Sequence, residues 1–354
     1  MNAGREAMRA VRFQEYGDPD VLEVREIPVP VPGPDEVLVR VHAAGLNPKD
    51  AMIRSGALGL QAGRTLPRGT GFDFAGEVAE AGSGVSDLPV GTAVWGFLDG
   101  VLGGAAADYV VAPRAWVAPA PAGLSWLEAA SLPLAGSAAL QALRDVARVR
   151  PGERVLVRGA AGGVGSAAVQ VAKLLGARVT AAARRGALPH ARTLGADMVL
   201  DAATLSLSGH RFDVVLDCVG CGPVRLARDF LAPGGRWVAV APSLPVFALA
   251  PLTGWLGRRL GMRSFGFVVV RPRSGDLAWL ADQATRGALR VSVTAAYPLE
   301  HVRDSHRDLE EGGARGKRVL AVSDAALAEA AEAGLLDSGV VAAGPRAPVG
   351  AAAA

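Results

Sequence analysis

The clearest chemical signal in this sequence is a glycine-rich turn, Gly159-Ala-Ala-Gly-Gly-Val-Gly165. Its first glycine lets the chain turn sharply out of a strand, the fourth position lets the backbone approach a pyrophosphate, and the seventh lets a helix pack closely on the strand. The amino end of that helix offers free N–H groups and a positive dipole end to phosphate oxygens. The pattern predicts a dinucleotide site, with a plain strand-to-helix turn as the alternative. The residues assigned to it are Gly159, Ala161, Gly162, Gly163, Val164 and Gly165.

The residues after the next strand-like run indicate which dinucleotide binds. A site for NAD usually carries an aspartate or glutamate about 20 residues after the first glycine, where it accepts a hydrogen bond from the ribose 2′-hydroxyl. This chain has Ala181-Ala-Ala-Arg-Arg185 there, without a carboxylate. Arg184 and Arg185 are suited to pair with a 2′-phosphate through charge-assisted hydrogen bonds. We therefore expect NADPH as the cofactor; the alternative is that both arginines are solvated on a loop.

Alternating strands and helices surround this turn. Apolar, strand-like runs are separated by segments with helical spacing that end in a glycine, such as Gly176 and Gly195. Such alternation is typical of a parallel, doubly wound α/β sheet. The predicted strands cover 154–158, 178–182, 198–200, 213–217 and 236–240, and the predicted helices cover 164–175, 188–194 and 276–287.

The preceding part of the chain follows a different pattern. Residues 8–121 consist of short strand-like runs with glycine turns, and the prolines between 28 and 34 exclude a helix there, so we expect an all-β, barrel-like region. Ser125 with Glu128 forms a capping box that predicts a helix over 125–149. After residue 290 the chain leaves the sheet. Residues 297–300, a helix over 301–311 and a strand over 317–322 are expected to return to the first region.

Composition and charge exclude several classes of function. Half of the 354 residues are hydrophobic and the mean hydropathy is +0.27, which is sufficient for a large core. The net charge is only +3 and no basic block is interleaved with aromatic residues, so nucleic acid is not an expected partner. No membrane span is expected either, because the most apolar stretch, 244–260, is interrupted by prolines, glycines and two arginines.

The cysteine and histidine content argues against a metal. Cys218 and Cys221 form a C-x-x-C pair directly after an apolar run, and no second pair completes a structural zinc site. Packing is therefore favoured over redox or metal chemistry for these two residues. None of the five histidines shows ligand spacing, and no metal is expected. The cysteine usage fits a reduced, cytoplasmic compartment.

Several ordered motifs together resemble one family, the medium-chain dehydrogenase/reductase superfamily in its zinc-free quinone oxidoreductase type. The resemblance covers residues 8–323, and the ending Ala314-Arg-Gly-Lys317 with Asn47-Pro48 is similar to the reticulon-interacting branch. The motifs, besides the glycine turn, are Ala44-Gly-Leu-Asn-Pro-Lys-Asp50, Ile53-Arg-Ser-Gly56, Gly71-Phe-Asp-Phe-Ala-Gly76, Ala129-Ala-Ser-Leu-Pro133, Leu194-Gly-Ala-Asp197, Leu216-Asp-Cys-Val-Gly220 and Gly316-Lys317.

This resemblance implies a fold, domain boundaries and an assembly. The expected fold class is α/β, a GroES-like β-barrel domain interrupted by a Rossmann domain with a doubly wound parallel sheet. Residues 8–130 and 295–324 would form the GroES-like catalytic domain, and residues 131–294 the Rossmann NADPH-binding domain. Residues 1–7 are expected to be a disordered leader, and 325–354 an Ala/Gly-rich tail with one short helix. The active site would lie between the domains, and a homodimer is expected.

The resemblance also bears on zinc. Zinc alcohol dehydrogenases of this superfamily place a cysteine where Leu46 or Asn47 stands, and a Gly-His-Glu motif where this chain has Gly71-Phe-Asp-Phe. They also carry a four-cysteine lobe, whereas this chain has no cysteine before Cys218. Neither a catalytic nor a structural zinc site is therefore expected.

The implied reaction is hydride transfer from NADPH to a quinone or an α,β-unsaturated carbonyl compound. The protein must hold a small apolar acceptor and stabilise negative charge on its oxygen. Asn47 is the expected catalytic residue, with a turn residue before Pro48 as the alternative, and Lys49 is a candidate to assist. Many relatives carry a tyrosine where Met52 stands, so the proton donor stays open, water included. Two other functions stay open: an alcohol dehydrogenase or ketone reductase, which would need a metal, and an NADPH-binding interaction protein with little catalysis.

Further site residues are assigned by the resemblance alone, and packing is the alternative for each of them. The expected cofactor contacts are Ser137, Cys218, Val219, Val240, Ala241, Phe267, Arg315 and Lys317. The expected lining of an apolar substrate pocket is Ile53, Trp95, Phe97 and Phe265.

Overall fold

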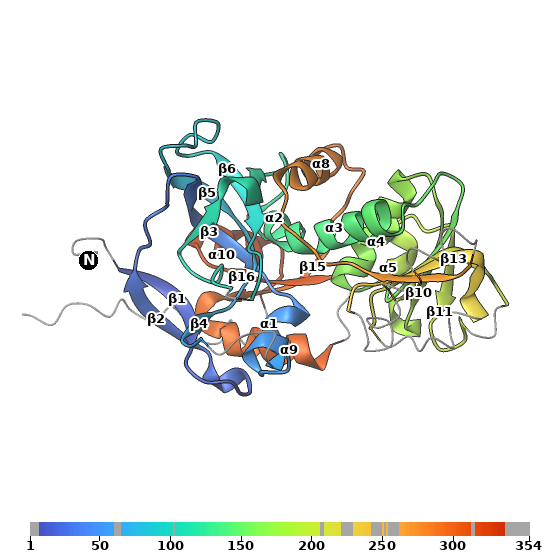
Figure 1. Cartoon of the computed structure of the whole chain (residues 1–354). Helices are drawn as coiled ribbons and strands as arrows, with labels where there is room; N and C mark the ends of the chain where they lie inside the picture. The colour runs from blue at the N-terminus through green and yellow to red at the C-terminus, as the bar shows by residue number, and fades with distance from the viewer. Residues whose placement is uncertain are drawn as a thin grey trace, which may run out of the picture.

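The chain folds into two lobes that are joined by a helical connection (Figure 1). The computed structural model describes residues 7–59, 65–101, 103–205, 209–220, 229–241, 250, 253, 262–312 and 316–336. The strands β1 to β8, together with β15 and β16 near the end of the chain, build one lobe, which we call the barrel lobe. The segment from β9 to β14 builds the other, which we call the parallel-sheet lobe.

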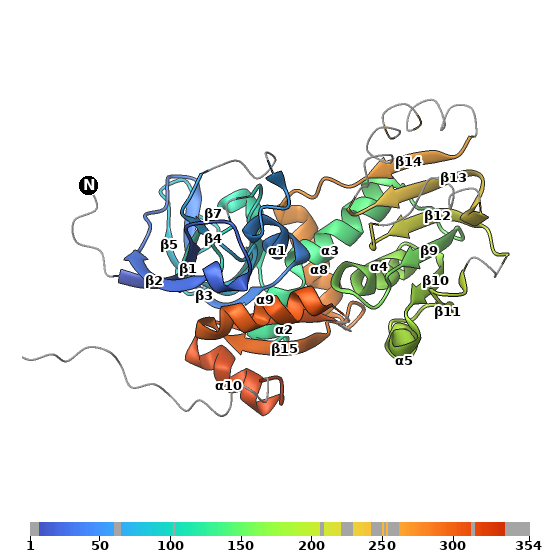
Figure 2. The ribbon, with the colours of Figure 1, turned by 90° about the horizontal axis from the view of Figure 1, so that it is seen from below.

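Within the described residues, the parallel-sheet lobe contains six strands in the order β11-β10-β9-β12-β13-β14, all paired in parallel (Figure 2). The central strands are apolar on both faces, because each face is covered. Val155 and Val157 of β9 belong to one hydrophobic cluster, and Leu156 between them belongs to another. The strands are β9 (Arg154–Arg158), β10 (Arg178–Ala183), β11 (Met198–Asp201), β12 (Phe212–Asp217), β13 (Leu231–Ala239) and β14 (Ser264–Phe267).

The helices of this lobe follow the same sequence pattern. Helix α4 (Gly163–Leu174) packs its alanine and valine face on β9 and β10, and a left-handed Gly176 (φ 80°) follows its end. Helix α5 (Leu188–Thr193) packs on β10 and β11, whereas α8 (Ser274–Thr285), also predicted, lies against α3 and against β6 and β8 of the barrel lobe. The predicted doubly wound parallel sheet is confirmed, and β13 begins at Leu231, earlier than the predicted start at residue 236.

The barrel lobe contains two further sheets among the described residues, ordered β2-β1-β4 and β15-β16-β3-β5-β6-β8, with β7 paired to β3. The last two strands in the sequence, β15 and β16, complete the longer sheet, so the chain returns to the first lobe as predicted. These strands are β1 (Ala7–Phe13), β2 (Glu23–Pro28), β3 (Glu36–Gly45), β4 (Arg68–Gly69), β5 (Asp73–Ala81), β6 (Ala93–Phe97), β7 (Tyr109–Pro113), β8 (Val117–Pro119), β15 (Val293–Pro298) and β16 (Lys317–Ala321).

The single helix predicted over 125–149 is wrong. The chain forms α2 (Trp126–Ser131), begins a second helix α3 (Pro133–Leu140), and continues as a π-helical turn (Gln141–Val146). Pro133 has no N–H to donate and stands at the first position of α3, so it separates the two helices. The predicted capping box is confirmed, since Ser125 Oγ accepts from the N–H of Glu128 and the Glu128 carboxylate accepts from the N–H of Ser125.

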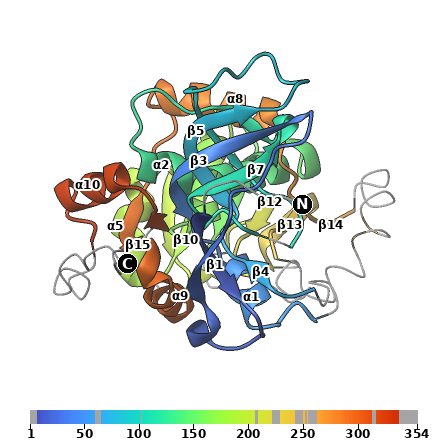
Figure 3. The same cartoon turned by 90° about the vertical axis from the view of Figure 1, so that its left-hand side faces the viewer.

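The remaining helices cover the barrel lobe. Helix α1 (Pro48–Arg54) packs against α9 (Val302–Glu311), and α10 (Asp324–Glu332) lies against α2 at the outer flank (Figure 3). Short 3₁₀ turns cover Pro19–Val21, Arg114–Trp116, Arg185–Ala187 and Leu299–His301. No helix in the described part of the chain combines the length and apolar character needed to cross a bilayer.

One hydrophobic cluster joins the two lobes. It includes Trp95 and Phe97 from β6, Leu140 from α3, and Val157 with Val169 from the parallel-sheet lobe. Because packed side chains resist deformation, this shared core fixes the parallel sheet against β6 and the helices α2 and α3. Residues 1–6 of the expected leader and 337–354 of the expected tail lie outside the described residues.

Candidate functional site

The glycine turn connects β9 to α4, as the sequence predicts. Gly159 has φ 74°, a left-handed conformation that glycine adopts without strain. A Cβ at Gly165 would lie 2.1 Å from the carbonyl oxygen of Gly159, so a side chain there would force the helix away from the strand. A Cβ at Gly162 would meet only that oxygen, at 3.5 Å, and the backbone at this position is open to a ligand. The three glycines therefore have the separate roles that a dinucleotide turn requires.

The amino end of α4 is built to receive an anion. Gly162 is the N-cap, so no side chain satisfies the first N–H groups of the helix. These groups and the positive end of the helix dipole attract phosphate oxygens. The residues present thus fit the pyrophosphate of a dinucleotide cofactor.

A cavity of about 260 Å³ lies where this turn meets the barrel lobe. It is bounded by the start of α1, by the glycine turn, and by the stretch from the end of α9 to the start of β16, which are three distant parts of the sequence. Its wall is made by Leu46, Asn47, Pro48, Ala135, Gly159, Gly162, Gly163, Val164, Gly165, Cys218, Leu309, Gly312, Gly316, Lys317 and Arg318.

Three buried polar side chains are bonded to one another at this wall. The Lys317 ammonium lies 2.6 Å from Asn47 Oδ1 and 3.1 Å from Asp73 Oδ2, and Asn47 Nδ2 donates to the same Asp73 oxygen at 2.9 Å. Asp73 is 0% exposed and Lys317 7% exposed. A buried charge is tolerated only when it is paired and hydrogen-bonded, and here the lysine and the carboxylate satisfy this condition together.

The second oxygen of Asp73 connects this network to the helices. Asp73 Oδ1 accepts from the N–H of Leu134, in the first turn of α3, at 2.6 Å. A carboxylate is favourable at a helix amino terminus. Gly45 allows the close approach, since a Cβ there would lie 2.2 Å from the carbonyl oxygen of Ala130 and 2.9 Å from Asp73 Cβ. Asp73 thus joins β5, α1, α3 and β16 at one point.

Asp50 positions the start of α1. Its carboxylate accepts from the N–H of Asn47 at 2.9 Å, from the N–H of Gly71 at 2.7 Å and from Thr70 Oγ1 at 3.1 Å. Burial raises the pKa of this carboxyl group to about 6, although these hydrogen bonds oppose the shift. Asp50 therefore holds Asn47 at the cavity wall and does not itself line the cavity.

Lys49 does not reach the described cavity. Its ammonium lies 4.1 Å from the centre of the Phe72 ring, in a cation–π arrangement. Burial lowers the pKa of Lys49, while Asp50, Asp99 and Asp73 partly compensate. The expected catalytic role of Lys49 has no support from this placement.

The two arginines expected at the cofactor 2′-position lie at the carboxyl end of β10. Both are exposed, and no described residue pairs with Arg184. Arg185 is 87% exposed at its side chain and pairs with Asp201 Oδ2 at 3.3 Å. Asp201 could not be found from sequence spacing, because it is the last residue of β11 and is brought beside Ala183 only by strand pairing.

The other expected cofactor contacts divide into three groups. Cys218, at the end of β12, and Lys317 line the cavity. Ser137 is fully buried on α3, and its hydroxyl has no partner in the described part of the chain, as expected of a group that meets a ligand. Val219 is exposed beside Gly159, while Val240, Ala241 and Phe267 lie at the carboxyl ends of β13 and β14, where ligands of such sheets bind. Arg315 and Cys221 lie outside the described residues.

The four residues expected to line the substrate pocket are buried in the structure, and their expected contact with a substrate stays a prediction. Trp95 and Phe97 are 0% and 1% exposed and belong to the core that joins the lobes, and Ile53 is 3% exposed within the barrel-lobe core. Phe265 is buried in the cluster on the far face of the parallel sheet. None of the four lines the described cavity. They are core residues, because large apolar side chains at strand positions facing another layer are buried by packing.

The sequence analysis gave Asp73 no functional role, although it quoted the Gly71-Phe-Asp-Phe-Ala-Gly76 motif. The signal was available in that motif, because a carboxylate inside an apolar strand run must be paired if it is buried. Its partners, Asn47 and Lys317, are 26 and 244 residues away and cannot be read from spacing.

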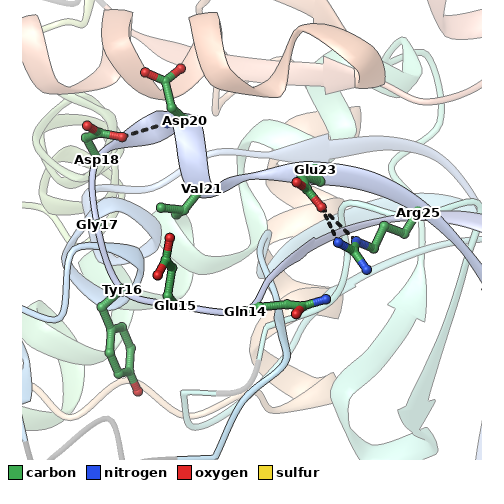
Figure 4. Close-up of a pocket in the computed structure, with 9 residues that line it drawn as sticks. All are labelled: Gln14, Glu15, Tyr16, Gly17, Asp18, Asp20, Val21, Glu23 and Arg25. Atoms are coloured by element: carbon green, nitrogen blue, oxygen red, sulfur yellow. Dashed lines mark hydrogen bonds and ion pairs between the residues drawn. The ribbon is translucent and has the colours of Figure 1, made fainter.

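A second concavity, of about 800 Å³, lies at the connection between β1 and β2 (Figure 4). Three of its acidic side chains already have structural partners: Asp18 accepts from the N–H of Asp20, Asp20 pairs with Arg307, and Glu23 pairs with Arg25. No residue assigned to the site by sequence lies there. Within the described residues, no group of three or more His, Cys, Asp or Glu side chains is arranged to hold a metal ion.

Comparisons with known proteins agree with this architecture. Residues 33–122 match the family model of the alcohol dehydrogenase GroES-like domain, and residues 194–320 match that of the zinc-binding dehydrogenases. The expected GroES-like domain beside a Rossmann-like domain is thereby confirmed.

Individual relatives cover nearly the whole chain. It is 31% identical to a chloroplast envelope quinone oxidoreductase homolog of Arabidopsis thaliana, over 88% of this chain and 98% of that one. It is 30% identical to the mitochondrial NAD(P)H oxidoreductase RTN4IP1 of Danio rerio, over 91% and 93%.

Solved structures show the same relationship. The structure of the quinone oxidoreductase from Coxiella burnetii superimposes with a TM-score of 0.80 at 33% identity, over 90% of this chain and 100% of that one. The CurK enoyl reductase superimposes with a TM-score of 0.76 at 26% identity, over the same shares. The chain is an oxidoreductase with a nicotinamide cofactor site. By its motifs, its two-lobed fold and these relatives, it belongs to the medium-chain dehydrogenase/reductase superfamily, in the quinone oxidoreductase type.

Proposed function

We propose that the chain is an NADPH-dependent reductase that transfers hydride to a quinone or an α,β-unsaturated carbonyl compound. The observation that carries this proposal is the 260 Å³ cavity, which brings the phosphate-binding turn of one lobe against the Lys317–Asn47–Asp73 network of the other. Such an arrangement holds a cofactor and an acceptor together and presents positive charge to the acceptor. The names of the relatives, quinone oxidoreductases and an enoyl reductase, support the class of acceptor.

Each part of the site has a defined task in this reaction. The glycine turn and the amino end of α4 would hold the pyrophosphate, and Ser137, Cys218 and Val219 would border the nicotinamide half. When bound, the cofactor supplies the hydride. Lys317 and Asp73 are both buried, and the low dielectric of a buried position strengthens the electrostatic interactions of Lys317.

The choice of NADPH rests on the exposed end of β10. Arg184 is free of any described partner and projects from the place where an NAD site carries a carboxylate. Arg185 is held near it by Asp201. A 2′-phosphate would form charge-assisted bonds with this pair. The cytoplasmic location and the homodimer expected from the sequence stay predictions.

A substrate screen tests the proposal. The chain is mixed with NADPH or NADH and, in turn, with 1,4-benzoquinone, 1,4-naphthoquinone, 2-hexenal and cyclohexanone, and the loss of reduced-cofactor absorbance is followed. We expect turnover of quinones or the enal with NADPH at higher kcat/KM than with NADH, and no turnover of the saturated ketone. NADPH binding without turnover of any acceptor would favour a binding protein. Ketone reduction together with one zinc per chain in elemental analysis would favour an alcohol dehydrogenase.

A further inference from the structure

The side-chain amide of Asn47 is fully engaged by the protein. Its orientation is determined by its partners, because a lysine ammonium only donates and a carboxylate only accepts. Asn47 Oδ1 therefore faces Lys317, and Nδ2 donates to Asp73 Oδ2 at 2.9 Å and to the carbonyl oxygen of Gly45 at 3.4 Å. Both N–H groups of the amide are directed to protein acceptors. Asn47 has no N–H left for the oxygen of a substrate.

Lys317 is different, because an ammonium group has three N–H donors. One is directed to Asn47 Oδ1 and one to Asp73 Oδ2. The third has no partner among the described residues, and Lys317 lines the cavity. The stem of the side chain crosses the glycine turn, since a Cβ at Gly163 would lie 2.8 Å from Lys317 Cδ. The ammonium is therefore held between the phosphate-binding turn and the barrel lobe.

The side chains of Cys218 and Arg318, which also line the cavity, are poor proton donors. Burial raises the pKa of the Cys218 thiol above its usual range, and a neutral thiol donates only weakly. The Arg318 guanidinium is engaged by both carboxylate oxygens of Asp308, through Nε and through Nη2 at 2.7 Å. Among the described residues of the wall, Lys317 is the cation that can release a proton, because the guanidinium of Arg318 keeps its charge.

We propose that Lys317 is the catalytic residue that contacts the oxygen of the acceptor and protonates it, and that Asn47 and Asp73 are its positioning residues. This inference rests on the proposed hydride-transfer function. When the hydride bonds to the acceptor, a π-electron pair of the acceptor moves to its carbonyl oxygen, which becomes negative. One Nζ–H bond of Lys317 breaks, the proton bonds to that oxygen, and the neutral amine regains a proton from water. The acceptor thus gains one hydride and one proton.

Mutation of Lys317 tests the proposal kinetically. Lys317→Met keeps the length of the side chain and removes the ammonium. The matched control is Lys173→Met, because Lys173 lies on α4 and forms an exposed ion pair with Asp197. A general acid contributes about 100- to 10,000-fold to a rate. We expect Lys317→Met to lower kcat at least about 100-fold while the Kd for NADPH changes less than about threefold. Lys317→Arg should stay slow at neutral pH, because a guanidinium keeps the charge and does not release its proton.

The positioning role of Asp73 needs a separate variant. Asp73→Asn retains the shape of the side chain and removes its charge, and it should lower kcat with little effect on the Kd for NADPH. Because Lys317→Met leaves Asp73 without its cation, the double variant Lys317→Met/Asp73→Asn removes both charges together and keeps the test valid if the single variant unfolds. The two kcat losses should not add, since both act through one ammonium group.

A spectroscopic readout does not depend on turnover. The chain has three lysines, Lys49, Lys173 and Lys317, so the lysine ¹³Cε signals can be assigned with one Lys→Met variant each. The probe is 4-nitrophenolate, an oxyanion that resembles the developing enolate, added to the chain saturated with NADP⁺. We expect the Lys317 signal to move on titration and the Lys49 and Lys173 signals to stay, and we expect Lys317→Met to bind the phenolate at least about tenfold more weakly.

The outcomes separate the two proposals. Retained kcat in Lys317→Met, or a loss confined to the Kd for NADPH, would overturn the catalytic role and make Lys317 a phosphate contact. A wild-type chain that reduces no acceptor would contradict the proposed function, and the lysine proposal would then be decided by the ¹³Cε titration. An unmoved Lys317 signal at saturating phenolate would refute it.

Discussion

The Lys317 ammonium and the Asn47 side-chain oxygen, 270 residues apart in the sequence, form a 2.6 Å hydrogen bond at the wall of the cavity. This bond joins the last strand of the barrel lobe to the start of α1, beside the glycine turn. Asp73 holds both partners from a fully buried position. The cofactor turn and the polar network thus face one another across a single cavity.

The glycine turn provides the first prediction. Gly165→Ala places a Cβ 2.1 Å from a backbone oxygen, so we expect a loss of roughly 1–3 kcal/mol in the free energy of unfolding together with weaker NADPH binding. Gly162→Ala meets nothing closer than 3.5 Å and should fold normally, yet still weaken NADPH binding because its methyl group occupies the approach of the pyrophosphate. Urea unfolding and fluorescence titration with NADPH measure the two effects. Equal stability losses in both variants would contradict the assignment of separate roles.

The carboxyl end of β10 provides the second prediction. Arg184→Ala should raise the Kd for NADPH about tenfold to hundredfold, because a charge-assisted hydrogen bond contributes about 1.5–3 kcal/mol, and should leave NADH binding unchanged. Arg178→Ala, at the opposite end of the same strand, is the control. Isothermal titration with both cofactors makes the comparison. If Arg184→Ala weakened NADH as much as NADPH, the arginine would not be reading the 2′-phosphate.

His306 makes the fold sensitive to acid. It is fully buried on α9, and burial together with the nearby Arg54 lowers its pKa to about 3. Its ordinary pKa of 6.5 applies in the unfolded chain, so the unfolded state binds the proton first as the pH falls. Stability present above pH 6.5 is therefore lost progressively down to about pH 3. We expect His306→Gln to flatten this dependence by up to about 1.4 kcal/mol per pH unit in urea unfolding at pH 7 and pH 4.5. If the free energy of unfolding depended on pH equally in the wild type and in His306→Gln, His306 would not be the source of the acid sensitivity.

Asp50 has the opposite effect. Its folded pKa of about 6 lies above the ordinary value of 3.8, so the folded state binds the proton first as the pH falls. Ionisation of Asp50 thus costs stability as the pH rises from about 4 to about 6, and this contribution partly offsets that of His306. Asp50→Asn removes it, and the variant should lose stability on acidification more steeply than the wild type, by up to about 1.4 kcal/mol per pH unit. Equal slopes in the two proteins would show that the pKa of Asp50 is the same in the folded and unfolded states, and a shallower slope in the variant would show that folding lowers this pKa.

The carboxyl-terminal helix provides the last prediction. The Glu329 carboxylate accepts from the N–H of Trp126 at 2.9 Å, so α10 caps the amino end of α2, which leads to Asp73 and the cavity. Glu329→Ala should cost about 1 kcal/mol of unfolding free energy, as the loss of a helix cap does, with kcat little changed. Glu332→Ala, at an exposed position of the same helix, should cost almost nothing. Matching losses in the two variants would mean that the cap is not stabilising.

Local patterns in the sequence were sufficient for much of the fold. The alternation of apolar strands and helices after residue 154 predicted the parallel sheet, because a doubly wound sheet requires that periodicity. The glycine spacing predicted the turn, because only glycine fits at Gly159 and Gly165. Pro133 divided the helix predicted over 125–149, and this local signal was overlooked.

The sequence by itself determined the family, the glycine turn and the alternation of strands and helices, since each rests on local motifs whose residues lie close together in the chain. Only the tertiary structure decided which side chains meet at the cavity. It brought Asn47, Asp73 and Lys317 within hydrogen-bonding distance and placed Trp95, Phe97 and Ile53 in the core. The physical reason is that burial and pairing depend on contacts between distant segments. A buried charge must lie beside a partner in the folded structure, and the spacing of residues in the sequence does not show which distant residue that partner is.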